Sequence, residues 1–271
     1  MSTAFQRIFP QARPIIGMIH LRALPGTPAY GSDDALILET ALEEAALYKK
    51  AGLDALMLEN MHDVPYVRRQ VGPEITAMMT LVAHEVRKQT QLPCGLQILA
   101  GANRQALAVA KAADLQFIRA EGFVYGHLAD EGYMDADAGE LLRYRRQIEA
   151  EHIAIFTDIK KKHSAHQLTA DVDIVETAQT AAYFRSDALI LTGAATGQQA
   201  NLNELNQVQQ AVDLPVLLGS GITLDNLAVC LQADALIVGS WFKEKGHWAN
   251  ALSYDRVARF MDRVRQLRDS T

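Results

Sequence analysis

Polar side chains stand directly after several short apolar runs of this 271-residue sequence. In chain order they are His20, Glu59, Asn60, Gln97, Arg119, Glu121, Asp158, Lys160, Thr192 and Gly193. Carboxylates, histidine and lysine are common proton-transfer groups in enzymes, and arginine binds carboxylate or phosphate through its planar fork. If the apolar runs are parallel strands of one sheet, these side chains converge at one end of it, where chemistry becomes possible.

Four of these residues are predicted to be catalytic: Glu59, Asp158, Lys160 and His20. Asp158 and Lys160 are two residues apart, so on a strand they share a face. A lysine beside other cations has a lowered pKa and could serve as base or nucleophile. Lys160 could instead hold a substrate anion while Asp158 accepts a proton or binds a metal. Glu59 could also form a salt bridge at the rim, and His20 could be structural.

The next two lysines, Lys161 and Lys162, are expected to form a solvated basic loop. A second set is expected to bind the substrate, and it comprises Asn60, Gln97, Arg119, Glu121, Thr192 and Gly193. Arg119 either clamps an anionic group or pairs with Glu121.

A metal site is conceivable, because Glu59, Asp158, His20 and His163 are all potential ligands. No pair of histidines has the local spacing of a metal-binding helix, however. We therefore predict no cofactor, and metal dependence stays open.

Two glycine-serine turns follow the last two apolar runs. They contain Gly219, Ser220 and Gly221, and then Gly239 and Ser240. Glycine lets backbone N–H groups approach an anion closely, and serine adds a hydroxyl donor. A helix expected to begin near Thr223 would direct its positive end toward the same place. These residues are predicted to bind phosphate; tight-turn geometry alone is the alternative.

The apolar runs recur with a regular rhythm, and several open with aspartate, as in Asp-Ala-Leu-Ile at 187–190 and 234–237. This aspartate is expected to be a connecting-loop residue. Continuous apolar runs are typical of strands buried on both faces of a parallel sheet. The predicted strands are 14–20, 54–59, 93–99, 114–119, 153–160, 187–192, 215–220 and 234–239. The predicted helices are 33–51, 73–90, 103–113, 138–151, 171–185, 202–212, 223–232 and 254–267.

Eight strands that each precede a helix predict an α/β fold, a single (β/α)8 TIM barrel. The prediction is one domain over residues 1–271, with residues 1–13 as an N-terminal extension. A doubly wound open sheet is less consistent, because the first turn lacks G-x-G-x-x-G. Two long loops, 21–32 and 122–137, are of a length typical of lids over a site.

Composition narrows the classes of partner. The net charge of −6 argues against binding to DNA or RNA. The two cysteines, Cys94 and Cys230, are expected to be buried small apolar residues. The N-terminus lacks a signal-peptide pattern, and no apolar run reaches the roughly 20 residues of a membrane span. We predict a cytoplasmic protein, a homo-oligomer, with a small phosphorylated metabolite as its partner.

The assembled motifs resemble those of the BtpA/SgcQ family over nearly the whole chain. The resemblance rests on segments 16–21, 24–26, 59–60, 63–66, 158–163, 191–197, 218–222 and 238–243, and on the last helix with Arg256, Phe260 and Met261. It implies a TIM barrel of the ribulose-phosphate-binding type, in a family described mostly as predicted enzymes. One branch is linked to photosystem I biogenesis and another to sugar metabolism. Gln97 and Glu121 depart from the pattern of the photosystem branch, which suggests a different substrate.

The leading hypothesis is an enzyme that acts on a small phosphorylated sugar or nucleotide-derived metabolite by acid–base chemistry. Isomerase, lyase and hydrolase reactions all fit the residue set. The alternative is a non-catalytic assembly or biogenesis factor for a membrane protein complex.

Overall fold

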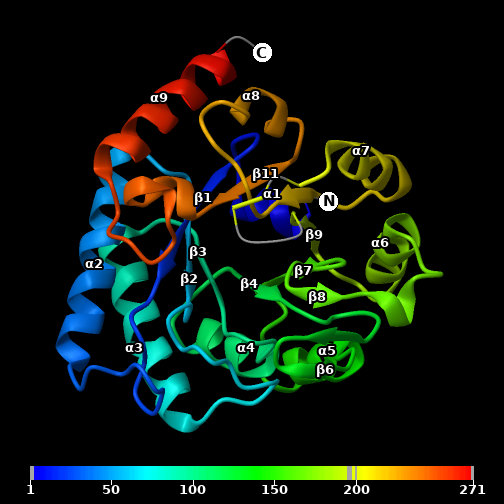
Figure 1. Cartoon of the computed structure of the whole chain (residues 1–271), viewed down its shortest axis with the longest axis horizontal. Helices are drawn as coiled ribbons and strands as arrows, with labels where there is room; N and C mark the ends of the chain where they lie inside the picture. Colours follow the sequence, from blue (N-terminus) through cyan, green and yellow to red (C-terminus); the bar gives the residue numbers. More distant parts are fainter. Residues whose placement is uncertain (1–2, 194–196, 199, 270–271) are drawn as a thin grey trace.

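Eight parallel strands close into a barrel in the computed structural model, which describes residues 3–193, 197–198 and 200–269. The strands follow the order β1-β11-β10-β9-β7-β4-β3-β2 around the barrel. Helices surround them, as the view in Figure 1 shows. The predicted TIM barrel is confirmed. The family motif at 191–197 includes residues 194–196, which lie outside the described residues.

The barrel strands are β1 (Ile15–His20), β2 (Ala55–Glu59), β3 (Cys94–Gln97), β4 (Phe117–Ala120), β7 (Ala154–Asp158), β9 (Ala188–Leu191), β10 (Val216–Leu218) and β11 (Ala235–Val238). The helices are α1 (Ala4–Ile8), α2 (Asp34–Ala51), α3 (Pro73–Thr90), α4 (Asn103–Ala112), α5 (Ala138–Gln147), α6 (Ile174–Tyr183), α7 (Leu202–Ala211), α8 (Leu227–Cys230) and α9 (Tyr254–Asp269). Three short 3-10 helices are η1 (Gln167–Thr169), η2 (Ser240–Phe242) and η3 (Glu244–Gly246).

Alternation along each strand separates two apolar layers. Ile16 and Met18 of β1 belong to the cluster inside the barrel, whereas Ile15 and Ile19 belong to the cluster between barrel and helices. Because successive side chains of a strand point to opposite faces, His20 shares the inward face of Ile16 and Met18. The same rule fixes which polar residue at each strand end faces inward.

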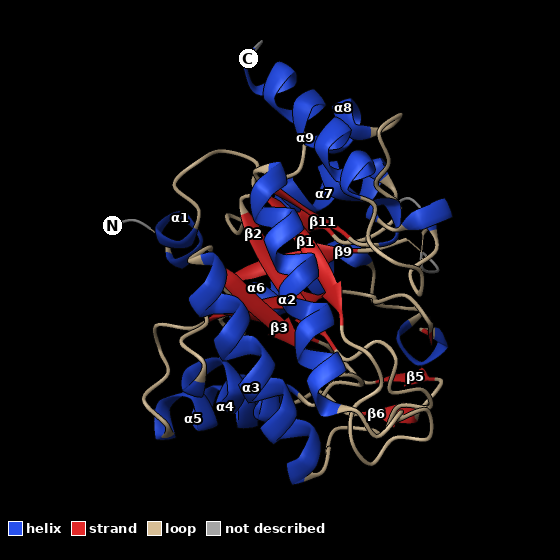
Figure 2. Cartoon of the chain, turned by 90° about the vertical axis from the view of Figure 1, so that its left-hand side faces the viewer, coloured by secondary structure: helices blue, strands red, loops and turns tan. Residues whose placement is uncertain are grey.

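The N-terminal segment closes the bottom of the barrel. Phe5 of α1 and Phe9, which follows it, pack on the stacked rings of Phe117 and Phe156, whose centroids are 4.8 Å apart. Figure 2 shows α1 at the opposite end of the barrel from β5 (His127–Ala129) and β6 (Gly132–Met134). Phe5 and Phe9 are therefore part of the core.

The aspartates that open the repeated strands have a defined structural role. Asp54, Asp187 and Asp234 each accept the backbone N–H of the first or second residue of the preceding barrel strand, at 2.7–2.8 Å. In the fourth such pair the acceptor is Gln116, which binds the N–H of Cys94 at 2.9 Å. A side-chain acceptor thus joins consecutive strands in four pairs around the barrel, and these residues hold the N-terminal ends of the strands in register.

Three predictions need correction. The strand expected over 153–160 ends at Asp158, because the chain turns and Lys160 adopts a positive φ of 43°. The helix expected over 223–232 is a single turn, Leu227–Cys230, since Asn226 and Thr223 bind each other's backbone N–H groups ahead of it. The loop 122–137 contains a hairpin, β5–β6, which pairs with β8 (Ser164–Ala165).

Cys94 and Cys230 are buried free thiols, as expected. Within the described part of the chain, no helix is both long enough and apolar enough to cross a membrane.

The strand-joining aspartates give a prediction about stability. Asp234→Ala leaves the Val216 N–H without its acceptor, so we expect a loss of about 1–3 kcal/mol in the free energy of unfolding. Urea denaturation of Asp234→Ala and Asp187→Ala measures it. The exposed Asp213, just before β10, is the matched control, and its alanine variant should stay within about 0.5 kcal/mol of the parent. Equal losses in all three variants would contradict this role.

Candidate active site

The inward-facing positions at the C-terminal strand ends form a polar ring at the barrel mouth. Each polar residue follows an inward apolar residue by two positions: His20 follows Met18, Glu59 follows Met57 and Asp158 follows Phe156. The same alternation places Gln97, Arg119, Thr192, Gly219 and Gly239 on this face. The structure thus brings most of the predicted residues to one end of the barrel.

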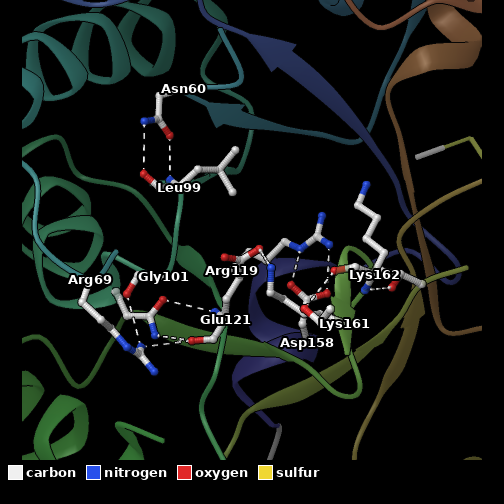
Figure 3. A network of polar contacts seen from close by, with 12 residues as sticks. Asn60, Arg69, Leu99, Gly101, Arg119, Glu121, Asp158, Lys161 and Lys162 are labelled. Carbon is white, nitrogen blue, oxygen red and sulfur yellow. Dashed lines mark hydrogen bonds and ion pairs between the residues drawn. The ribbon is translucent and has the colours of Figure 1, made fainter. Parts of the chain in front are cut away.

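Arg119 and Asp158 form a buried bidentate ion pair at the centre of the mouth (Figure 3). The Arg119 Nε and Nη2 groups donate to the two carboxylate oxygens at 2.8 and 2.9 Å. Only 5% of the Arg119 side chain and none of the Asp158 side chain is exposed. Because both oxygens of Asp158 are engaged, this carboxylate orients the guanidinium and is poorly placed for proton transfer.

His20 and Glu59 face each other on neighbouring strands. Nε2 of His20 lies 3.7 Å from Oε2 of Glu59, and Nδ1 lies 3.2 Å from the Trp248 carbonyl oxygen. Burial, followed by the charge of Lys243, lowers the pKa of His20 to about 3. The ring is therefore neutral near pH 7, donates Nδ1–H to Trp248 and presents an Nε2 acceptor.

Burial raises the pKa of Glu59, although the nearby Arg119 and Lys162 oppose that shift. The carboxyl group therefore holds its proton at a higher pH than an exposed glutamate does. A group of this kind exchanges protons more readily near neutral pH, so Glu59 has the properties of a general acid–base.

Lys162, and not Lys160, lines the mouth. Lys160 Nζ donates to the Thr169 carbonyl at 3.0 Å, and its side chain lines a separate small hollow beside His127 and His166. Lys162 shares a hollow with Glu59 and Arg119, and burial, followed by the charge of Arg119, lowers its pKa. The expected inward pairing of Asp158 with Lys160 is wrong, because the strand ends before Lys160.

Lys161 is also not solvated. Its Nζ lies 3.5 Å from Oε1 of Glu121, and only 8% of its side chain is exposed. Glu121 therefore pairs with Lys161, while Arg119 pairs with Asp158. The expectation of a solvated basic loop is wrong for Lys161 and Lys162, which no local pattern of charge could have shown.

Two adjoining hollows open at the mouth. The first, of about 110 Å³, reaches the turns after β10 and β11, and the second, of about 340 Å³, reaches the ends of β3 and β4. Four residues line both, and these are Glu59, Met61, Arg119 and Lys162. The proton-transfer candidate and two cations therefore lie at the boundary between two compartments.

Gly219 and Gly239 keep the first hollow open. A Cβ atom at Gly219 would lie 2.8 Å from Cγ2 of Ile190 and 3.6 Å from Nη2 of Arg119. One at Gly239 would lie 3.2 Å from Nε2 of His20. Both glycines, with Ser220, Gly221 and Ser240, line this hollow.

The Ser220 hydroxyl group already accepts one hydrogen bond and donates another within the protein. Its Oγ accepts the Gly193 N–H at 2.6 Å and donates to the Gln198 carbonyl at 2.9 Å. The single turn of α8 is too short to act as a helix dipole. The first hollow therefore offers backbone groups and nearby cations to a ligand, and the expected helix terminus does not contribute.

Asn60 and Thr192 hold loops in place. The Asn60 side chain accepts the Leu99 N–H at 2.7 Å (Figure 3). It also donates to Asp63, which in turn accepts the Leu24 N–H. Thr192 Oγ1 accepts the backbone N–H of Lys162 at 3.1 Å. This second contact fixes the backbone from which the Lys162 side chain extends. Neither Asn60 nor Thr192 lines the two hollows, nor does Gly193.

The four potential metal ligands do not come together. Both oxygens of Asp158 bind Arg119, and His163 is exposed. Across the described ranges, no group of three or more histidine, cysteine, aspartate or glutamate side chains is arranged to hold a metal ion.

A closed parallel barrel with a buried polar ring at its C-terminal mouth defines a TIM-barrel protein, and its candidate site lies at that mouth. The chain belongs to the BtpA family, whose model matches residues 11–266. It is 48% identical over 268 residues to a Caenorhabditis elegans protein whose name includes "mitochondrial", with 97% of each chain covered. It is 32% identical over 256 residues to the photosystem I biogenesis protein BtpA of Synechocystis, covering 94% of this chain and 88% of that one.

Solved structures share the fold at low identity. One is (S)-3-O-geranylgeranylglyceryl phosphate synthase from Thermoplasma acidophilum, with a TM-score of 0.62, 15% identity, and 98% and 100% of the two chains covered. Another is orotidine 5'-monophosphate decarboxylase from Methanocaldococcus jannaschii, with a TM-score of 0.59, 11% identity, and 93% and 99% covered. These similarities establish the barrel.

The lowered pKa of His20 predicts a pH dependence of stability. The unfolded chain binds a proton at this ring below about pH 6.5, whereas the folded protein binds it only near pH 3. Between these values the unfolded state holds more protons, so lowering the pH destabilises the fold by up to about 1.4 kcal/mol per unit. His20→Gln should flatten that dependence.

Urea denaturation at several pH values between about 7 and 4 measures the effect. The control is His84→Gln, because His84 is exposed on α3. The two variants would show the same slope if His20 were not held neutral.

Proposed function

We propose that this protein is an enzyme that acts on a small phosphorylated metabolite, a sugar phosphate or a nucleotide-derived compound, by acid–base catalysis at the barrel mouth. One observation carries the proposal: the Glu59 carboxyl group is buried, has a raised pKa and lines both hollows beside Arg119 and Lys162. Burying three ionisable groups together costs stability, and such clusters are concentrated at functional sites.

The phosphate would bind in the first hollow. Gly219, Gly221 and Gly239 allow an anion to approach the backbone, and Lys162 and Arg119, which line the same hollow, supply positive charge. Turns after the seventh and eighth strands commonly hold phosphate in TIM barrels. Support also comes from the Thermoplasma acidophilum synthase of the same fold, whose structure is described as a complex with sn-glycerol-1-phosphate.

The remainder of the substrate would lie beside Glu59. In its ionised form Glu59 removes a proton from a carbon or hydroxyl group of the substrate and then returns it. The Lys162 ammonium stabilises the oxyanion or enolate that forms, and Asp158 holds the Arg119 guanidinium in a fixed orientation. His20 is neutral and offers Nε2 as an acceptor for a substrate hydroxyl. Isomerase, lyase and hydrolase reactions are consistent with this set.

A role in assembly of a membrane complex is the second candidate. It is favoured by the name of the Synechocystis relative, which describes a photosystem I biogenesis protein. In that case the polar mouth would bind a regulatory ligand or none.

A metabolite screen separates the two candidates. Thermal-shift measurements with sugar phosphates and nucleoside monophosphates, with inorganic phosphate as competitor, identify compounds that bind in the first hollow. Mass spectrometry after incubation then detects conversion of each hit. Conversion supports the enzyme, and phosphate-sensitive binding without conversion of any hit favours the regulatory ligand of the second candidate. If neither inorganic phosphate nor any phosphorylated compound binds, the proposal is wrong.

The two lysines provide a matched pair of variants. Lys162→Met removes a cation from the mouth, so we expect affinity for inorganic phosphate to fall about 10-fold and turnover of a substrate to fall 100-fold or more. Lys160→Met removes a cation that binds Thr169 outside the mouth, so both should change less than about 3-fold. Calorimetric titration measures the affinity. A larger effect of Lys160→Met would reverse the assignment.

The pKa shifts of Glu59 and Lys162 predict a narrowed bell-shaped pH profile. Glu59 must be ionised to act as base, and its pKa is raised, so activity on the acid side falls off above the ordinary glutamate pKa of 4.5. Lys162 must be charged, and its pKa is lowered, so the alkaline fall begins below 10.5. The profile of kcat/KM checks both limbs. Lys162→Arg should remove the alkaline limb, because arginine stays protonated.

A further inference from the structure

Two residues that line the second hollow carry buried side-chain oxygen atoms that accept no hydrogen bond from the described residues. They are Oε1 of Gln97, at the end of β3, and Oε2 of Glu121, just beyond β4. Gln97 and Glu121 are 2% and 6% exposed, and neither atom has a hydrogen-bond partner among the described residues. Both residues line the second hollow. Buried polar atoms are almost always paired, so two together mark a place where a ligand completes the pairing.

Both atoms can only accept. A carboxylate oxygen and an amide oxygen have no proton to donate, so the complementary group on a ligand must carry O–H or N–H donors. The other oxygen of Glu121 already faces Lys161 at 3.5 Å, which fixes the side chain and directs its charge to one partner. A ligand oxygen without a proton at this place would leave both acceptors unpaired and would meet a negative charge.

The surrounding charges also favour a ligand group that donates hydrogen bonds over one that carries a negative charge. Asp130 and Glu131 also line the second hollow, and Oε2 of Glu131 is a third buried oxygen that has no partner in the described structure. Among the cations, Arg119 is bound by Asp158 and Lys161 by Glu121. Lys162 lies at the boundary with the first hollow. Among the described residues, Glu59 is the only carboxylate that lines the first hollow, whereas the second is lined by Glu59, Glu121, Asp130 and Glu131.

The walls between these polar groups are apolar. Met61, Tyr66, Leu99 and Trp248 line the second hollow together with Gln97 and Glu121. Apolar walls suit the carbon skeleton of a ligand, while the buried acceptors determine its orientation.

We propose that the ligand of this site has two unlike ends: a phosphate in the first hollow, and in the second a group that bears hydroxyl or amino donors to Gln97 and Glu121. A second acidic group at that end is excluded. This inference rests on the proposed phosphate site and adds the chemistry of the opposite end of the substrate.

Matched pairs of small phosphates test the inference on the full chain. Glycerol phosphate and phosphoglycerate differ in that a carboxylate replaces a terminal CH₂OH, and ribitol phosphate and phosphoribonate form a longer pair. Calorimetric titration should show that the alcohol of at least one pair binds about 10-fold or more tightly than its acid, since the acid leaves buried acceptors unpaired. Inorganic phosphate alone is the reference for the first hollow.

Two variants connect the preference to the named residues. Glu121→Gln removes the charge and Gln97→Met removes the amide acceptor, and each should reduce the alcohol-to-acid ratio at least 3-fold while affinity for inorganic phosphate changes less than 2-fold. Glu39→Gln, at an exposed position of α2, is the matched control and should leave the ratio unchanged. A variant that no longer distinguishes alcohol from acid but still binds inorganic phosphate has lost recognition of the donor group, whereas a variant that fails to fold loses both.

The outcomes distinguish this inference from the proposed function. If inorganic phosphate binds but the acids bind as tightly as the alcohols, or no compound of either pair binds, the inference is wrong and the phosphate site stands. It is also wrong if neither variant changes the ratio. If inorganic phosphate itself does not bind, both the inference and the proposed function are wrong.

Discussion

The buried ion pair between Arg119 and Asp158 marks the level at which the apolar interior of the barrel gives way to a polar layer. Two residues earlier on the same adjacent strands, Phe117 and Phe156 stack to fill the barrel. The next inward layer replaces two aromatic rings with two opposite charges, each satisfied by the other. An unpaired charge at this depth would cost several kcal/mol, so neither residue can be removed singly without leaving the other uncompensated. The interior changes there from an apolar core to a polar floor.

That floor defines the electrostatics of the mouth. Because Asp158 binds the guanidinium through both oxygens, Arg119 presents a fixed and partly neutralised cation to its neighbours. Glu59 and Lys162 then lie in a poorly hydrated space, where burial raises the pKa of the carboxyl group and lowers that of the ammonium. The pKa of Glu59 and the pKa of Lys162 thus both move toward neutral pH, one from below and one from above. A group whose pKa lies closer to the working pH has both its protonated and its deprotonated form available for proton transfer.

The alternation of inward-facing and outward-facing side chains along the strands could be predicted well from the sequence. His20, Glu59, Gln97, Arg119 and Asp158 each end a short apolar run, and period-two geometry brings them to one mouth. The sequence did not show where the chain leaves the β7 strand. Lys160 lies two residues after Asp158, but the backbone turns at a positive φ and Lys162 reaches the mouth. The partners of Lys161 and Ser220 likewise lie far away in the sequence. The run of lysines therefore wrongly predicted a solvated Lys161, and the sequence did not show that the Ser220 hydroxyl is hydrogen-bonded within the protein.

The two ends of the strands carry separate tasks. At their N-terminal ends, Asp54, Asp187, Asp234 and Gln116 join neighbouring strands, and Phe5 and Phe9 close the barrel. At their C-terminal ends, Gly219 and Gly239 leave room for the side chains of Arg119 and His20. Since the side chains that hold strand register lie at the N-terminal ends, Gln97 and Glu121 beside the second hollow can be replaced without disturbing that register. A family can therefore keep one barrel while its members differ in the group that they bind beside Glu59.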